Sequence, residues 1–175
     1  MKQLKFILPA LLLLCLFAGV GDAQTKKTRK RIVKNSSVIK TIPPLEVRAA
    51  REKVANQLDN VKLFVDVLGP IAQGIEKLDA SAKTKQLSKS TADQNEAHKQ
   101  KVITAIRNLK DGLTNLETEF RTKAVLQKYL PNIQGITDLA ADSEDMAIAG
   151  KFVASKEPLR SVAKKLTDTL AVIPQ

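Results

Sequence analysis

Cysteine and the large aromatic residues are nearly absent from this sequence. The chain has one cysteine, no tryptophan and one tyrosine. Cys15 lies in an N-terminal apolar segment that we expect to be removed on export, and the mature chain would then have no disulfide, no thiolate nucleophile and no cysteine metal site. Because Tyr129 is the only tyrosine, residues that stack on sugars or line drug-like pockets are scarce. Such a domain must be held together by its apolar core.

Sequence motifs for catalysis are missing as well. The only histidine, His98, lies in a polar stretch, and one imidazole forms no catalytic triad without a nucleophile and an orienting acid. The chain contains no His-x-x-x-His or Glu-x-x-His pair for a metal, and no Gly-x-Gly-x-x-Gly, Walker or Gly-x-Ser-x-Gly motif. No spacing singles out two facing carboxylates, as glycosidases use. We therefore predict no catalytic residue, no metal and no cofactor, and a protein that is not an enzyme.

An acidic cluster near residue 143 is the remaining candidate for binding a metal ion. Asp142, Glu144 and Asp145 could together contact a hard cation. They lack the glycine and the spaced final glutamate of a calcium-binding loop. We therefore interpret them as an acidic turn that also caps the helix after it.

The N-terminus has the organisation of a secretory signal peptide, which we assign to residues 1–23. Two lysines precede an uncharged apolar run over residues 6–20, and small residues stand at Gly21 and Ala23, the two positions that a signal peptidase reads. We expect cleavage after Ala23 and export to the periplasm or the extracellular space. Two alternatives fit less well. A membrane anchor needs about 20 apolar residues, and lipid attachment at Cys15 needs a small residue where leucine precedes it. No second such run follows, so we predict no transmembrane segment in the mature chain.

A basic segment follows the expected cleavage site. Residues 24–40 contain seven basic residues and no acidic one, whereas residues 41–175 contain 20 basic and 17 acidic residues. Residues 24–42 have few aliphatic and no aromatic residues, so we expect a flexible linker. Its charges could bind a polyanion by counterion release. The candidate residues are Lys26, Lys27, Arg29, Lys30, Arg31 and Lys34. Anionic lipid or an envelope polymer is favoured over nucleic acid, because no aromatic residue is present to stack on bases.

The remaining chain, residues 43–175, has the apolar spacing of α-helices. The longest apolar stripe advances in steps of three and four residues, and no run shows the steps of two expected of a strand. Its members are Val47, Ala50, Val54, Leu58, Val61, Val65, Leu68, Ile71, Ile75 and Leu78. Either one long helix bends at Pro70 or two helices meet there, and the unbroken phase of the stripe favours the bend. Residues 80–90 are predicted to be a frayed helix end and a loop.

Further amphipathic segments follow this first helix. Their expected ranges are 91–128, 133–140, 146–152 and 155–173. The first of them starts at a capping-box-like pair, Ser90 and Asp93, and passes through Gly112, where glycine costs about 1 kcal/mol relative to alanine. Four to five such helices with short connections predict an all-α antiparallel bundle with coiled-coil-like packing.

Two function classes remain after these exclusions. The first is a secreted or periplasmic, non-enzymatic helical interaction protein that binds a partner through a helix face or a groove. The second is a protein that binds a polyanion or an anionic membrane surface through its basic N-terminal segment. They differ in their response to salt, because binding by counterion release weakens as the salt concentration rises.

Overall fold

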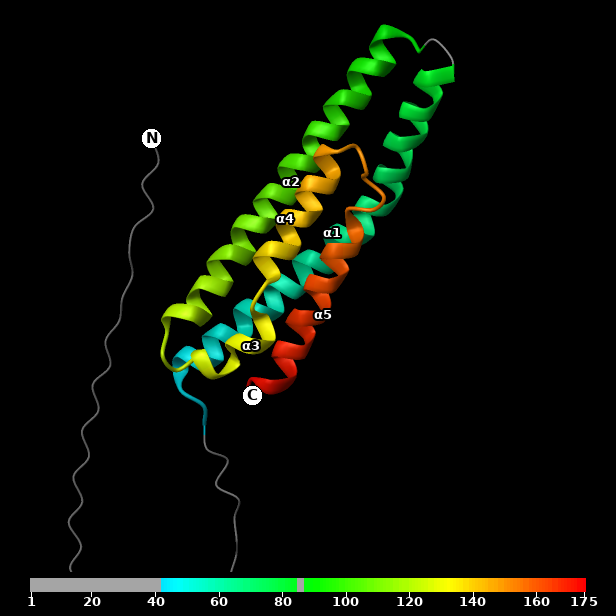
Figure 1. Ribbon diagram of the computed structural model, residues 1–175. Coiled ribbons are helices and arrows are strands. Elements are labelled where there is room, and N and C mark those ends of the chain that lie inside the picture. The colour runs from blue at the N-terminus through cyan, green and yellow to red at the C-terminus, as the bar shows by residue number, and fades with distance from the viewer. Residues whose placement is uncertain (1–41, 85–86) are drawn as a thin grey trace, which may run out of the picture. The chain divides into compact units, whose positions relative to one another are not determined.

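Four long helices pack against one another in the computed structural model, which describes residues 42–84 and 87–175 (Figure 1). They are α1 (Leu45–Thr84), α2 (Lys89–Thr122), α4 (Ile136–Ile148) and α5 (Lys156–Val172). A short 3₁₀ turn, η1 (Gln127–Tyr129), and a single helical turn, α3 (Leu130–Ile133), connect α2 to α4. The described part of the chain contains no strand, and the prediction of an all-α helical bundle is confirmed.

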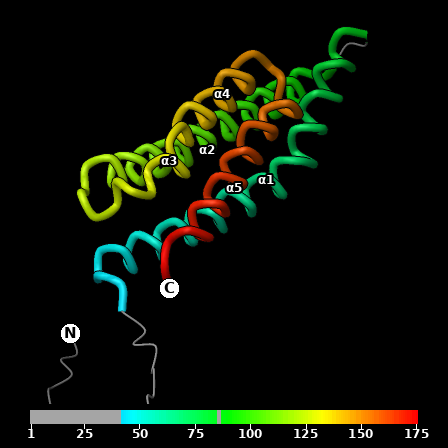
Figure 2. Tube along the Cα trace, turned by 60° about the horizontal axis from the view of Figure 1, so that its bottom comes forward, coloured from blue at the N-terminus to red at the C-terminus, as the bar shows by residue number. Residues whose placement is uncertain are grey.

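Neighbouring helices run antiparallel to each other. α4 packs on α2, α5 packs on α1, and α4 and α5 pack on each other (Figure 2). α1 and α2 also meet, and their far ends extend past the connection between α4 and α5 (Figure 1). One side of the α1–α2 pair is therefore covered by α4 and α5.

The core is built from one apolar stripe on each helix. Most of the stripe predicted on α1 is buried, but Ile71 is 42% exposed and Ala72 is fully buried in its place. Ala72 lies 18 residues after Val54, which is five complete turns, so the two residues share one helix face. The prediction was wrong at this position because it assigned the larger apolar residue, Ile71, to the buried face, where the smaller Ala72 lies.

Arg51 fastens the C-terminal end of α5 to α1. Its Nη1 donates hydrogen bonds to the carbonyl oxygens of Leu170 and Ile173, at 2.5 and 2.6 Å. These carbonyls belong to the last turn of α5, which has no following turn to donate to them. A side chain of α1 thus supplies the cap, and α5 ends close to the predicted residue.

Two predicted boundaries of the first helices differ from the structure. α1 continues to Thr84, where a loop was expected from residue 80, because the Ala- and Lys-containing segment favours helix even without apolar residues. α2 is capped by Ser88, whose Oγ accepts a hydrogen bond from the amide of Thr91, and not by Ser90. α2 ends at Thr122 rather than near residue 128, and the chain then turns to bury Leu126 and Tyr129.

The acidic turn predicted at residues 142–145 is part of a helix. The segments expected at 133–140 and 146–152 are joined in α4, which begins after Gly135 and ends at Ile148. Ser143 and Glu144 are buried inside it, and Ser143 Oγ donates to the carbonyl oxygen of Ser155. Two of the four polar residues that suggested a turn, Ser143 and Glu144, are therefore buried against neighbouring segments.

Both positions that carry a helix-breaking residue lie within a continuous helix, as the unbroken apolar stripes predict. α1 passes through Pro70 and α2 passes through Gly112. The bend expected at Pro70 stays a prediction.

The remaining predictions concern parts of the chain outside the described residues. They are the signal peptide with Cys15, and the basic linker up to residue 41 with its six candidate polyanion-binding residues. Within residues 42–84 and 87–175, no helix has both the length and the apolar composition needed to cross a membrane.

Candidate functional site

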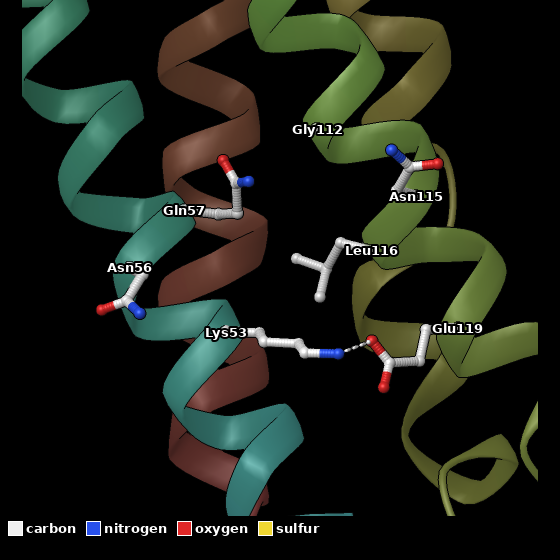
Figure 3. Close-up of a pocket in the computed structure, with 7 residues that line it drawn as sticks. All are labelled: Lys53, Asn56, Gln57, Gly112, Asn115, Leu116 and Glu119. Carbon is white, nitrogen blue, oxygen red and sulfur yellow. Dashed lines mark hydrogen bonds and ion pairs between the residues drawn. The ribbon is translucent and has the colours of Figure 1, made fainter.

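Two hollows lie along the seam between α1 and α2. The first is polar, has a volume of about 360 Å³ and lies near the start of α1. Figure 3 shows it with α4 and α5 behind. Its lining residues are Lys53, Asn56, Gln57, Gly112, Asn115, Leu116 and Glu119.

An ion pair bridges this polar hollow. Lys53 Nζ reaches across from α1 and lies 2.7 Å from Glu119 Oε2 on α2 (Figure 3). Glu119 Oε1 also accepts a hydrogen bond from Lys123 at 2.6 Å. Burial raises the pKa of the Glu119 carboxyl, but hydrogen bonds from Lys123 and Lys53 lower it more, so the pKa lies below its usual value. A carboxylate held ionised by two lysines joins the helices and is a poor general base.

Gln57 covers the middle of the seam. Its carboxamide lies over Gly112, and a Cβ at that glycine would be 2.9 Å from Gln57 Nε2. The Oε1 atom of Gln57 is buried and has no hydrogen-bond partner among the described residues. The absence of a side chain at Gly112 on α2 therefore leaves space that the end of the Gln57 side chain on α1 occupies.

The second hollow is almost wholly apolar. It has a volume of about 260 Å³ and lies further along the same seam. Its lining residues are Phe64, Val67, Leu68 and Ile71 from α1, and His98, Lys101, Val102 and Ala105 from α2. Val67 is 51% exposed, although a valine is usually placed in the core. We take this apolar groove as the candidate functional site.

His98 and Lys101 line the α2 side of the apolar groove. Both are exposed, and no acidic residue is among the described residues that line it. The site therefore offers carbon surface beside positive charge. It lacks the assembled acid, base and nucleophile that covalent catalysis requires.

Glu117 is buried between α2 and α4 and performs a structural task. Its Oε1 and Oε2 accept hydrogen bonds from the amides of Gly135 and Thr137, both at 3.1 Å, and Arg121 lies 3.0 Å away. Burial raises the pKa of Glu117, but these hydrogen bonds lower it more, and the net pKa is below its usual value. The carboxylate thus caps α4 at its N-terminus.

Glu144 joins α4 to α2 in a similar way. Its carboxylate pairs with Lys110 and with Arg107, whose Nη2 lies 2.7 Å away. The hydrogen bond from Lys110 lowers the pKa of Glu144 more than burial raises it, and Arg107 lowers it further. Its two acidic neighbours, Asp142 and Asp145, are exposed. The three residues considered for a hard cation are therefore not directed to a common point, and no cluster of three or more metal-ligating side chains occurs in the described residues.

A third hollow, about 1140 Å³, lies at the far end of the bundle. Some of its polar groups have partners. Asp79 accepts one hydrogen bond from Asn95 and pairs with Lys99 at 2.7 Å, and Glu76 accepts one from the amide of Val153. These contacts hold the α1–α2 hairpin and the α4–α5 connection together, so this hollow is a weaker candidate than the apolar groove.

Comparisons with family models, with curated proteins and with solved structures gave no match. The assignment of the site therefore rests on its geometry.

The sequence-based prediction missed the groove. Ile71 was assigned to the core, and Leu63 and Val67 were not assigned to any face. A usable signal was present, since Leu63, Val67 and Ile71 recur every four residues beside the core stripe. α1 therefore has more apolar residues than one buried stripe requires.

Proposed function

We propose that this chain is an exported, non-enzymatic interaction protein that binds an amphipathic helix of a partner protein in the apolar groove. The observation that carries the proposal is the exposure of Val67 and Ile71 over a hollow lined almost wholly by carbon. Burying such side chains is favourable by about 25 cal/mol per Å² of apolar surface. Export is supported by the signal-peptide organisation of residues 1–23.

The walls of the groove favour a helix as the occupant. Two antiparallel helices form an elongated seam, and a helix in such a groove inserts apolar residues at positions i, i+3, i+4 and i+7. Lys101 and His98 stand on one wall, with no acid among the described lining residues. A partner helix with acidic residues beside its apolar face would complement this charge.

The test compares capture of a partner by the wild-type chain and by groove variants. Val67→Lys and Ile71→Lys place a charge in the groove, and Ile148→Lys is the matched control because Ile148 is an exposed aliphatic on α4. We expect the partner to be retained by the wild type and the control and lost by both groove variants, with unchanged circular dichroism. Equal capture by all four proteins would disprove the assignment.

A cross-link would locate the partner directly. The described residues contain no cysteine, so Val67→Cys introduces a single reactive position in the groove. A photoreactive label at that position should join to one helical segment of the partner, identified by mass spectrometry. The same label at residue 148 should not join to it.

The basic segment supports a second candidate function. Residues 24–40 carry seven positive charges without an acidic residue, which favours binding to an anionic lipid or polymer. Replacing the six candidate residues, Lys26 to Lys34, by glutamine should abolish salt-sensitive binding to anionic vesicles. Binding that survives this replacement has another cause.

A bend of α1 at Pro70 is part of the same proposal. Proline lacks an amide hydrogen and its ring crowds the preceding turn, so a helix usually bends there. Ile71, on the groove, follows it directly.

A further inference from the structure

One end of the bundle brings together segments that are far apart in the sequence. The start of α1, the chain after α2 and the C-terminus meet at the lower end in Figure 1. They line a shared hollow of about 350 Å³. Its lining residues are Pro43, Pro44, Val47, Ala124, Val125, Lys128, Tyr129 and Pro174. We call residues 42–45, 124–129 and 172–174 the bundle end.

Exposed aliphatic side chains gather at the bundle end. Of the eight large hydrophobic residues that are exposed in the described chain, four belong to it: Ile42, Leu45, Val125 and Val172. Ile42 and Leu45 are 74% and 72% exposed. They come from three separate segments, so folding places them at one end of the molecule.

The charge of the bundle end has one predominant sign. The chain from residue 120 to residue 137 contains three basic residues and no acidic one. Two of them are engaged, Arg121 with Glu117 and Lys123 with Glu119. The third, Lys128, is exposed, lies 4.9 Å from the centre of the Tyr129 ring and forms no ion pair among the described residues.

The basic segment directly precedes the bundle end in the sequence. Residues 24–40 contain seven basic residues and lead directly to Ile42. Glu46 in the first turn of α1 is an acidic residue at this end. The basic residues therefore adjoin, in the sequence, the exposed aliphatic residues with which the bundle end begins.

We infer that the bundle end docks on an anionic lipid surface. Its aliphatic side chains would enter the boundary between headgroups and acyl chains, while Lys128 meets the lipid phosphates. The basic segment that precedes Ile42 in the sequence adds positive charge to the same chain. The inference rests on the second candidate function and extends it to residues of the folded bundle. A lipid is favoured over a dissolved polyanion because only a lipid offers an apolar phase for Ile42 and Leu45.

The experiment measures co-sedimentation with vesicles, using the chain purified after expression with its own leader. The vesicles contain phosphatidylcholine alone or with phosphatidylglycerol, and heparin retention represents a dissolved polyanion. The bundle-end variant carries Leu45→Gln and Val125→Gln. Its matched control is Ile148→Gln, which alters an exposed aliphatic residue. Ile148 is the last residue of α4, and α4 ends away from the bundle end (Figure 1).

We expect the wild type and the control to bind the anionic vesicles equally. The bundle-end variant should bind them about tenfold more weakly, because two aliphatic side chains no longer enter the lipid. Lys128→Gln should weaken binding about fivefold, as one basic residue near an anionic surface does. Heparin retention of the Leu45→Gln, Val125→Gln protein should not change. Circular dichroism checks that each variant is folded.

Several results would overturn the inference. Equal vesicle binding by the bundle-end variant and the control would exclude the docking surface. A parallel loss of heparin retention in that variant would assign the surface to dissolved polyanions, and loss of a wild-type dimer in sedimentation would assign it to a second copy of the chain. The second candidate function is tested separately, by replacing the six candidate residues of the basic segment with glutamine. If that variant still binds vesicles in a salt-sensitive way, the second candidate function is disproved. The comparison of the Leu45→Gln, Val125→Gln variant with its control then still decides whether the bundle end binds lipid.

Discussion

The carboxylate of Glu117 on α2 accepts a hydrogen bond from the amide of Gly135, the residue that precedes α4, at 3.1 Å. Gly135 has a φ of +87° and provides no side-chain cap of its own. The first turn of α4 therefore depends on a residue that lies 18 positions earlier in the chain. A contact of this kind fixes where α4 begins relative to α2.

Loss of this cap should destabilise the bundle. Glu117→Gln keeps the size of the side chain but replaces one carboxylate oxygen by a donor, which cannot accept from an amide. We expect the free energy of unfolding to fall by about 1–3 kcal/mol, the range for a buried charge-assisted hydrogen bond. Urea denaturation measures it. The exposed Glu157→Gln, which alters an ion pair at the surface, should change it by less than about 0.5 kcal/mol. Similar losses for both would contradict the capping role.

The stability should also depend on pH in the acid range. The pKa values of Glu117, Glu119 and Glu144 are all lowered in the fold from their ordinary value of 4.5. Such groups stabilise the native state fully above the unfolded pKa, and this stabilisation is lost as the pH falls through the lower native pKa. We expect a thermal midpoint that is constant from pH 7 to 5 and falls below pH 4.5.

The control for this pH dependence is a variant with Glu117→Gln and Glu144→Gln. It should be less stable than the wild type at pH 7, and its thermal midpoint should fall less steeply below pH 4.5. An equally steep fall would show that other carboxylates cause the acid sensitivity.

Gly112 provides a test of the α1–α2 seam. A Cβ there would meet the far end of Gln57, a flexible side chain that can move aside. Because alanine is favoured over glycine in a helix by about 1 kcal/mol, we expect Gly112→Ala to be neutral or to stabilise by up to about 1 kcal/mol. Gly112→Leu adds a much larger side chain beside Gln57 and should lower the free energy of unfolding. Chemical denaturation measures this free energy for both variants. A large decrease for Gly112→Ala would show that Gln57 cannot move aside.

Pro70 tests the expected bend of α1. Replacing an exposed proline inside a helix by alanine restores the amide donor and removes the clash with the preceding turn. We expect Pro70→Ala to raise the free energy of unfolding by about 1–3 kcal/mol and to weaken capture of the partner by the groove, since a straighter α1 moves Ile71. Unchanged stability and unchanged capture would show that this proline has no such role.

The signal-peptide organisation of residues 1–23 predicts where the mature chain begins. Mass spectrometry of the exported chain should give a protein that begins at Gln24. Ala23→Arg removes the small residue that the peptidase reads and should leave the leader attached. An exported wild-type chain that retains residues 1–23 would contradict the prediction.

The helical segments could be predicted because their signal is local. Spacing of apolar residues identifies the inner face of α1 and α5, and a proline or a cap marks most helix starts. Prediction was wrong where a polar side chain has a distant partner. Ser143 and Glu144 looked like a turn because serine and acids favour turns, but Ser155, Arg107 and Lys110 satisfy them inside the bundle.

The sequence spacing shows that α1 has more apolar residues than one buried stripe requires, but it does not show which of them stay exposed, because exposure is a property of packing. Val67 and Ile71 are ordinary core residues by type, and only the position of α2 beside α1 leaves them at the surface of a hollow. The same reason applies to the bundle end, where the segment before α1 and the chain after α2, about 80 residues apart in the sequence, line one hollow.

The sequence by itself therefore determined that the chain forms amphipathic helices, that a basic segment without acidic residues precedes them, and that its N-terminus has the organisation of a leader. These features depend on residues within a few positions of one another. The tertiary structure decided which apolar side chains stay exposed, which carboxylates serve as caps and cross-links, and which segments share one end. Those outcomes depend on the axial offset and rotation of one helix against another, which residue spacing within a single helix does not specify.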